Sequence, residues 1–226
     1  MPGLLELPGV PESTRLPPDL AARLPASTPG PPWSCRVQAV LWWHRASPAA
    51  LEALPAVLRG RRTVGLTLAA FVRYVDSPVG PYSEVFAAPV LVTGPRGVPG
   101  VAVPFIAVDS LASVHGGRAH WGLPKALATF TRNGLARVAA VGDGWTVTAQ
   151  VRPCGPRLPF AGLLPTTNLL ADSSVASSLV RQAAVGRLGH VEVGCTGPTL
   201  PAWLLPGRHR CMQVLRARMV VGPPRR

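Results

Sequence analysis

One lysine, Lys125, stands in the stretch HWGLPKALATF at residues 120–130, and the chain of 226 residues contains no other. The remaining basic side chains among the 23 are all arginine. Arginine stays charged under ordinary conditions, whereas burial can make a lysine neutral and therefore nucleophilic toward a carbonyl group. Lys125 is thus a candidate Schiff-base former. The alternative is a compositional accident, since a bias toward Ala, Gly, Pro and Arg depletes lysine everywhere.

Other motifs that carry chemistry are absent from the sequence. It has no GxSxG nucleophile elbow, no P-loop and no dinucleotide-binding glycine pattern. The five histidines form no HExxH group, and the four cysteines lie far apart without a CxxC pair. We therefore expect no metal site, no cofactor and reduced thiols.

The formal net charge of +13 raises the question of a nucleic-acid partner. The arginines are scattered, however, and no helix-turn-helix, zinc-finger or RNP-like pattern accompanies them. The charge predicts weak, salt-sensitive adhesion to polyanions and no specific nucleic-acid partner.

The elements that must position Lys125 are mostly strands. Residues 35–44 alternate as a strand, and a short helix follows Ser47, with a proline at its first position. Residues 63–75 and 83–93 are β-branched and apolar and are separated by the turn DSPVGPY, which predicts a hairpin. Residues 100–108 read as another strand, followed by a helical turn at 110–116 with Asp109 as its cap.

The second half of the chain resembles an antiparallel meander followed by looser sequence. Strands are predicted at 128–132, 135–141 and 145–152, with breaks at NG and GDG. Residues 153–172 look rich in loops, and residues 190–195 and 211–221 read as further strands. The fold class predicted is α+β, with a mostly antiparallel, barrel- or cone-like sheet and a few short helices.

The domain organisation follows from proline distribution. Residues 1–32 carry a cluster of prolines and are expected to form an arm on a single domain that spans residues 33–226. The arm lacks the basic and apolar regions of a secretory signal, and no apolar run is long enough to span a bilayer as a helix. These features predict a cytoplasmic protein with no membrane partner.

Four stretches together resemble the acetoacetate decarboxylase-like family. GGRAHWGLPKA at 116–126 is similar to the family segment that ends in the Schiff-base lysine, and Lys125 falls on that position. GPYSE at 80–84 puts Glu84 on the family's active-site glutamate. CRVQAVLWWHRASPAALEALP, from residue 35, puts Arg36 on its active-site arginine, and TGPT at 196–199 is similar to a segment near the end of the fold.

The resemblance implies a cofactor-independent lyase that forms a lysine Schiff base with a small oxo acid, with decarboxylation of a 3-oxo acid as the preferred reaction. Lys125 is then the nucleophile, Glu84 moves protons, and Arg36 binds the carboxylate. Trp121 and Phe105 are expected to bind substrate and to exclude water from Lys125. Relatives form oligomers, so a homo-oligomer is expected.

The chain departs from the family pattern at three places. Ala126 replaces a second lysine, Ala119 replaces an acid, and the apolar LTLAAF at 66–71 offers no second glutamate. These losses affect activation and proton handling. They keep two alternatives open: a Schiff-base aldolase or dehydratase acting on a 2-oxo acid, and a non-catalytic relative that binds a small molecule.

Overall fold

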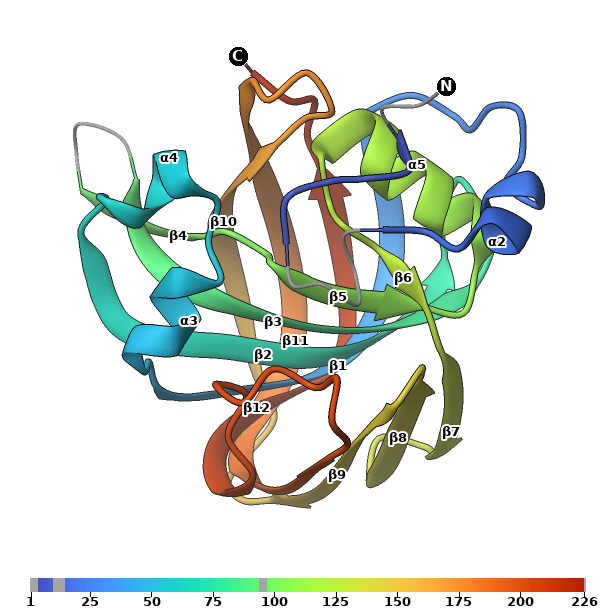
Figure 1. Ribbon diagram of the computed structural model, residues 1–226. Helices are drawn as coiled ribbons and strands as arrows, with labels where there is room; N and C mark the ends of the chain where they lie inside the picture. The colour runs from blue at the N-terminus through green and yellow to red at the C-terminus, as the bar shows by residue number, and fades with distance from the viewer. Residues whose placement is uncertain (1–3, 10–14, 94–96, 226) are drawn as a thin grey trace.

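The computed structural model describes residues 4–9, 15–93 and 97–225. Within these residues, twelve strands form one sheet (Figure 1). The strands are β1(Trp33–Arg45), β2(Thr63–Asp76), β3(Tyr82–Thr93), β4(Val98–Val101), β5(Phe105–Val108), β6(Ala126–Leu127), β7(Thr129–Asn133), β8(Arg137–Gly142), β9(Trp145–Pro153), β10(Leu158–Leu169), β11(Val175–Thr196) and β12(Gly207–Val221). The helices are α2(Pro18–Ala22), α3(Pro48–Glu52), α4(Ala56–Arg59) and α5(Leu111–Trp121).

Seven of the strands close into a barrel. Their order is β10-β4-β3-β2-β1-β12-β11, and β11 pairs back with β10 over residues 158–169. All of these contacts are antiparallel except the β10–β4 contact, where Thr166 lies opposite Val101 in a parallel register. The predicted α+β class and the barrel-like sheet are confirmed.

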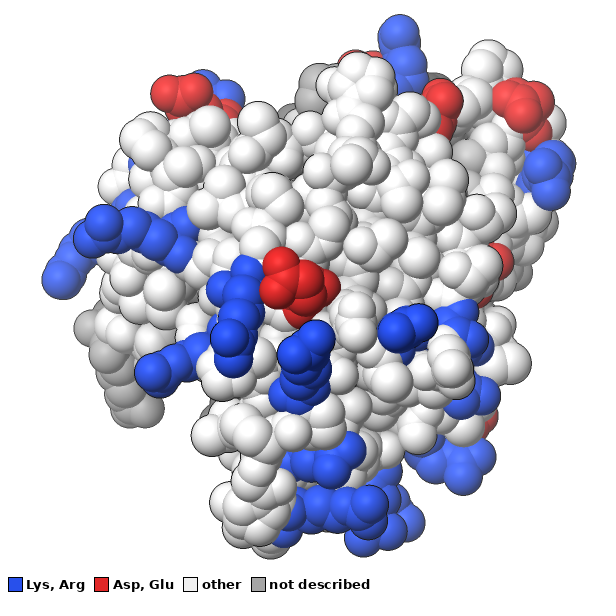
Figure 2. Space-filling view, turned by 90° about the horizontal axis from the view of Figure 1, so that it is seen from below, with Lys and Arg blue, Asp and Glu red and all other residues white. Residues whose placement is uncertain are grey.

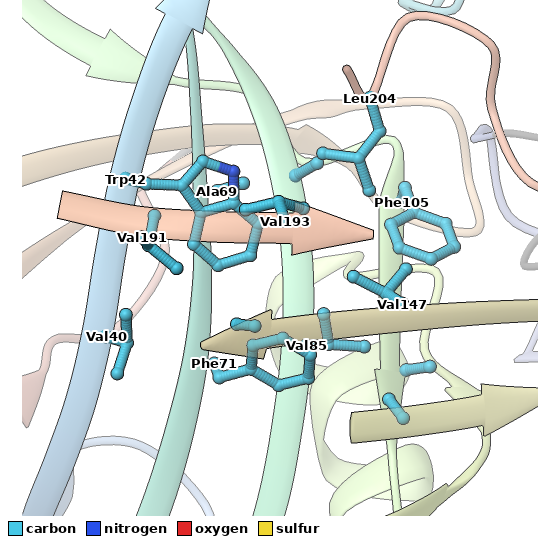
Figure 3. Close-up of a cluster of buried hydrophobic side chains, with 14 of the residues drawn as sticks. Val40, Trp42, Ala69, Phe71, Val85, Phe105, Val147, Val191, Val193 and Leu204 are labelled. Atoms are coloured by element: carbon cyan, nitrogen blue, oxygen red, sulfur yellow. The ribbon is translucent and has the colours of Figure 1, made fainter. Parts of the chain in front are cut away.

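The strands β7, β8 and β9 extend the sheet beyond β11 and fold over the outside of the barrel. Their buried side chains and those on the outer faces of β1, β2 and β3 form the main hydrophobic core (Figure 3). Val40, Phe71 and Val85 from the barrel meet Val147 and Val193 in this core. The barrel therefore has two apolar sides, one facing this core and one facing its own interior.

The helix α5 covers one end of the barrel and runs five residues beyond the predicted end at Gly116. Its N-cap is Ser110, whose hydroxyl accepts a hydrogen bond from the Ser113 N–H at 3.2 Å. The predicted cap, Asp109, instead accepts a hydrogen bond from the Ser83 N–H at 2.6 Å. That contact ties the start of α5 to β3.

Three regions differ from the sequence-based expectation. Residues 100–108, predicted as one strand, are divided between β4 and β5. Residues 158–169, predicted as loop, form β10, and the short strand predicted at 190–195 is the last part of the 22-residue β11. Proline and glycine in β10, together with exposed positions along both strands, obscure the alternating pattern. Pairing between the two strands over twelve registered residues stabilises both.

The described part of the N-terminal arm packs on the body of the protein. Leu7, Leu16 and Leu20 are buried, and the Thr28 hydroxyl lies 3.0 Å from His115 Nδ1 on α5. No helix in the described ranges is long and apolar enough to cross a membrane.

Candidate active site

A cavity of about 140 Å³ lies inside the barrel, and each of the seven ring strands contributes to its wall. Alternation along a strand explains this. In β1, Cys35, Val37 and Ala39 face the cavity, and the intervening residues face the other way. The wall is predominantly apolar, and its polar side chains are Cys35, Tyr74, Tyr82, Glu84, Lys125, Thr166 and Gln182.

Lys125 enters this cavity from the connection between α5 and β6. The helix ends at Gly122, whose left-handed backbone (φ 63°) turns the chain back toward the barrel. A side chain at this position would overlap the backbone of Leu169, so both the conformation and the space require glycine. The turn places Lys125 in the barrel wall with only 3% of its surface exposed.

The Lys125 amine makes two short hydrogen bonds inside the cavity. Its Nζ donates to Glu84 Oε2 at 2.7 Å and to Ser113 Oγ at 2.9 Å. Glu84 is 4% exposed and accepts a further hydrogen bond from the Tyr74 hydroxyl at 3.2 Å. The Tyr82 ring centroid lies 5.2 Å from Nζ, within the range of a cation–π contact. Every polar contact of the amine is therefore with a buried group.

The two tyrosines of the chain meet at this point and stack with ring centroids 4.0 Å apart. Burial and the Glu84 carboxylate raise the pKa of both Tyr74 and Tyr82 well above the usual value. The two phenols thus remain protonated and able to donate hydrogen bonds. Burial also raises the pKa of the Cys35 thiol to about 12, so the cavity wall carries a neutral thiol.

Helix α5 shapes the space around Lys125. A Cβ added at Gly117 would lie 2.6 Å from Lys125 Cδ and 2.7 Å from Cε, so the absent side chain leaves room for the lysine. Arg118 is 1% exposed, and its Nε donates to the Lys125 carbonyl at 2.9 Å. Arg118 also donates to the Leu4 carbonyl at 3.0 Å. The Gly-Arg pair therefore supports the lysine through packing and backbone contacts.

Three of the five predicted site residues meet in the cavity. Lys125 and Glu84 form the buried ion pair, and Trp121 lines the wall, where its indole N–H donates to the Gly222 carbonyl at 2.9 Å. The structure brings these residues together from α5, β3 and the turn after α5.

The other two predicted residues, Arg36 and Phe105, lie elsewhere. Arg36 follows Cys35 in β1 and therefore faces outward; its side chain is 67% exposed and pairs with Asp76 at 3.2 Å. Phe105 lies on the core side of β5 and packs against Trp145 with ring centroids 5.2 Å apart (Figure 3). Its neighbour Ile106 lines the cavity instead. The expectation that Arg36 and Phe105 face the substrate is corrected in both cases by strand alternation.

Sequence reasoning missed Ser113, Tyr74 and Cys35. The hairpin contained a signal for Tyr74, because a turn centred on Pro78 places Tyr74 opposite Tyr82 and Val72 opposite Glu84. Ser113 lies one helical turn before Gly117, and this spacing places both on the face of α5 that meets Lys125. Cys35 could be identified only after the structure showed which face of β1 lines the cavity.

The site combines a buried primary amine with a carboxylic acid in an apolar cavity. Among the described residues, no three His, Cys, Asp or Glu side chains gather so that they could hold a metal ion. An amine of this kind, once neutral, can add to a carbonyl carbon, and the adjacent acid can transfer the protons.

Comparison with known proteins shows the family of this chain. The family model of acetoacetate decarboxylase (ADC) matches residues 16–162, which is more than half of the chain. No curated protein sequence matches.

Several solved structures share the fold. Acetoacetate decarboxylase from Legionella pneumophila has 17% identity and a TM-score of 0.55, with 90% of this chain and 92% of that chain covered. The enduracididine biosynthesis enzyme MppR complexed with pyruvate has 15% identity and a TM-score of 0.61, with 88% and 91% covered. An acetoacetate decarboxylase-like enzyme from Sphingomonas wittichii RW1 has 18% identity and a TM-score of 0.53, with 88% and 94% covered. The matched sequence, the barrel and the lysine in its cavity lead to one conclusion: this chain belongs to the acetoacetate decarboxylase family.

Proposed function

We propose that this protein is a cofactor-independent lyase in which Lys125 forms a Schiff base with a small 3-oxo acid and releases carbon dioxide. The observation that carries the proposal is the Lys125–Glu84 pair, with Nζ and Oε2 2.7 Å apart inside an apolar cavity. An ammonium and a carboxylate that share a proton in such surroundings can become a neutral amine and a neutral acid by one short transfer.

The chemistry proceeds from that transfer. The neutral amine attacks the ketone carbon, and the proton on Glu84 passes to the hydroxyl of the resulting carbinolamine, which leaves as water. The iminium then draws the electrons of the C–C bond to the carboxylate carbon, so that carbon dioxide leaves and an enamine remains. Protonation of the enamine carbon and hydrolysis of the iminium release the ketone and restore Lys125.

The Tyr82 ring and Glu84 also support this sequence. Both face the nitrogen that carries the positive charge of the iminium, and both interact favourably with a cation. Tyr74 holds the second oxygen of Glu84 and thereby fixes the direction in which the first oxygen points.

The second candidate is an aldolase or dehydratase that acts on a 2-oxo acid. The fold neighbour complexed with pyruvate favours it. A 2-oxo acid keeps its carboxylate throughout an aldol reaction, however, and an unpaired buried carboxylate is costly. In the described part of the cavity wall, Lys125 is the sole cationic side chain and already pairs with Glu84. A 3-oxo acid meets the same cost when it binds, but decarboxylation relieves the cost as the C–C bond breaks, because the carboxylate leaves as neutral carbon dioxide.

The test is release of labelled carbon dioxide from [1-¹³C]acetoacetate, followed by NMR in wild type and in Lys125→Gln. Acetoacetate also decays spontaneously, so the variant supplies the baseline. Release at least about 10²-fold above that baseline is expected. If wild type matches the variant but converts pyruvate and an aldehyde to an aldol product, the aldolase assignment replaces the decarboxylase. If neither reaction occurs, and longer 3-oxo acids are not decarboxylated either, the protein is a binding relative without turnover.

A further inference from the structure

The cavity extends past Glu84 along the barrel. The register of the strands shows which residues line this part of it. Val72 lies opposite Glu84 on the neighbouring strand. Two residues farther along, Ala70 lies opposite Phe86 and is flanked on its other side by Leu41. A two-residue step along a strand is about 7 Å, so this second row lies one short alkyl chain beyond the carboxylate.

The side chains of this second row are apolar. Leu41, Ala70, Phe86 and, on β5 opposite Phe86, Ile106 all line the cavity. Ala70 is fully buried, and its small side chain leaves space between Leu41 and Phe86. We name these four residues the tail pocket.

Lys125 and Glu84 are the charged side chains of the described cavity wall. Among the described lining residues, no arginine, histidine or further acid accompanies that pair. Ala70 and Ile106 are buried and Leu41 and Phe86 are half-buried. A charged group in the tail pocket would therefore lose part of its hydration without gaining a partner, which is costly, whereas an alkyl group there gains from burial.

From these observations we propose that the substrate of Lys125 carries a short uncharged alkyl tail on the far side of its ketone, which the cavity volume limits to about three carbons. The inference rests on the proposed function and specifies its substrate class. It identifies a 3-oxo acid such as 3-oxohexanoate as a better substrate than acetoacetate, and Ala70 as the residue that sets the length of the tail.

The size of the cavity agrees with this assignment. An apolar cavity of about 150 Å³ holds a benzene molecule, and the cavity here encloses about 140 Å³. Decarboxylation of 3-oxohexanoate yields carbon dioxide and 2-pentanone, a ketone with as many non-hydrogen atoms as benzene. The C–C bond to the carboxylate breaks, its electrons enter the iminium, and one proton replaces the carboxylate on carbon.

The first experiment compares two ketones that differ only at the end of the tail. Wild-type protein is incubated with 2-pentanone or with 4-oxopentanoate, in which a carboxylate replaces the terminal methyl group, and is then reduced with borohydride. Peptide mapping quantifies the adduct on Lys125, which is the one lysine of the chain. We expect at least about tenfold more adduct with 2-pentanone. Equal adducts would overturn the inference and leave Schiff-base formation intact.

The second experiment tests the role of Ala70 with a matched control. Ala69 and Ala70 are adjacent in β2 and both fully buried, but Ala70 lines the cavity and Ala69 packs in the main core (Figure 3). Ala70→Val is expected to lower the ratio of 2-pentanone to acetone adduct by about tenfold. Ala69→Val should keep the wild-type ratio.

The remaining outcomes are also informative. An unchanged ratio in Ala70→Val, or the same change in both variants, would overturn the role of Ala70. If wild type gives no adduct with acetone, 2-pentanone or 4-oxopentanoate, the proposed function fails and the tail assignment fails with it. The wild-type comparison requires no variant, so it decides the substrate class even if a valine variant does not fold.

Discussion

At the scale of single residues, Lys125 is held by three side chains from two elements, β3 and α5. Glu84 comes from β3, Ser113 from α5, and the Tyr82 ring from the start of β3. A carboxylate placed 2.7 Å from the amine can both remove its proton and return one to the departing water. After Lys125, the proposed chemistry therefore depends most on Glu84.

Glu84→Gln tests this role. The amide keeps the size of the side chain and can still accept a hydrogen bond from Lys125, but it cannot take a proton. We expect the rate of carbon dioxide release from acetoacetate to fall by about 10²- to 10⁴-fold, with the protein still folded by circular dichroism. Tyr74→Phe is a suitable comparison, because it removes one hydrogen bond to Glu84 without removing the acid. A rate in Glu84→Gln within a few-fold of wild type would exclude proton transfer by this residue.

The site was predictable from sequence only in part, because a motif does not show which face of a strand a residue lies on. The stretches ending in Lys125 and Glu84 resembled family motifs, and both residues lie in the cavity. The resemblance put Arg36 on the family's active-site arginine, and Phe105 was expected to bind substrate, but an error of one residue along a strand changes the face on which a side chain lies. Cys35 and Ile106, their immediate neighbours, are the residues that face the cavity.

At the scale of elements, α5 and the turn that follows it determine where the lysine lies. Ser110 begins the helix, Gly117 leaves room for the lysine side chain, and Gly122 ends the helix in a left-handed turn. The sequence predicted the start of this helix within one residue but ended it at Gly116, because two adjacent glycines usually disfavour a helix. The need for space beside Trp33 and Lys125 explains why both glycines lie inside the helix.

Gly117→Ala is expected to disturb the lysine more than it disturbs the fold. Alanine is the better helix former by up to about 1 kcal/mol, which offsets part of the cost of crowding. Its Cβ would lie 2.6 Å from Lys125 Cδ, so the lysine must move, and a shift of about 1 Å can cost about 10²-fold in rate. Borohydride trapping of acetone on Lys125 should fall by that order, while the urea midpoint changes little.

Gly60→Ala provides the control for that substitution, since nothing lies within 4 Å of a Cβ added there. It should leave trapping at the wild-type level. If Gly117→Ala traps acetone on Lys125 as well as wild type does, the position of the lysine does not depend on the space that Gly117 leaves for it.

Arg118 offers a second test at this scale. Arg118→Met removes the donor that satisfies the buried Lys125 carbonyl at 2.9 Å. We expect the free energy of unfolding in urea to fall by about 1–3 kcal/mol, and amide hydrogen exchange at residues 122–126 to accelerate. Arg216→Met, at an exposed position on β12, should change neither quantity. Unchanged exchange at 122–126 in Arg118→Met would contradict the role of Arg118 in holding this turn.

At the scale of the whole molecule, the sequence predicted a barrel-like sheet but did not predict which strands close the barrel. Closure depends on β10 and β11, whose pairing joins residues that are locally irregular in sequence. Long-range pairing of this kind leaves little periodic signal, because each strand is stabilised by its partner rather than by its own pattern. The homo-oligomer expected from the family resemblance stays a prediction.

The surface charge makes a prediction of its own. Figure 2 shows arginine side chains spread over one face with few acids among them, and the formal net charge is +13. We expect a labelled single-stranded oligonucleotide to bind at 50 mM salt and to bind weakly, with Kd above about 1 μM, at physiological salt. Fluorescence anisotropy across a salt series measures this. Binding that stays tight at physiological salt would point to a dedicated nucleic-acid site.

The central claim, that Lys125 forms a Schiff base, is tested most directly by the mass of the protein after reduction. Wild type and Lys125→Arg are each incubated with acetoacetate or acetone and sodium borohydride, then digested and mapped. Since the chain has one lysine, the competing primary amine is the N-terminus, which serves as an internal reference. The account predicts a reduced adduct on Lys125 in wild type, and in the variant labelling at the N-terminus alone. Labelling of the N-terminus alone in wild type would contradict it.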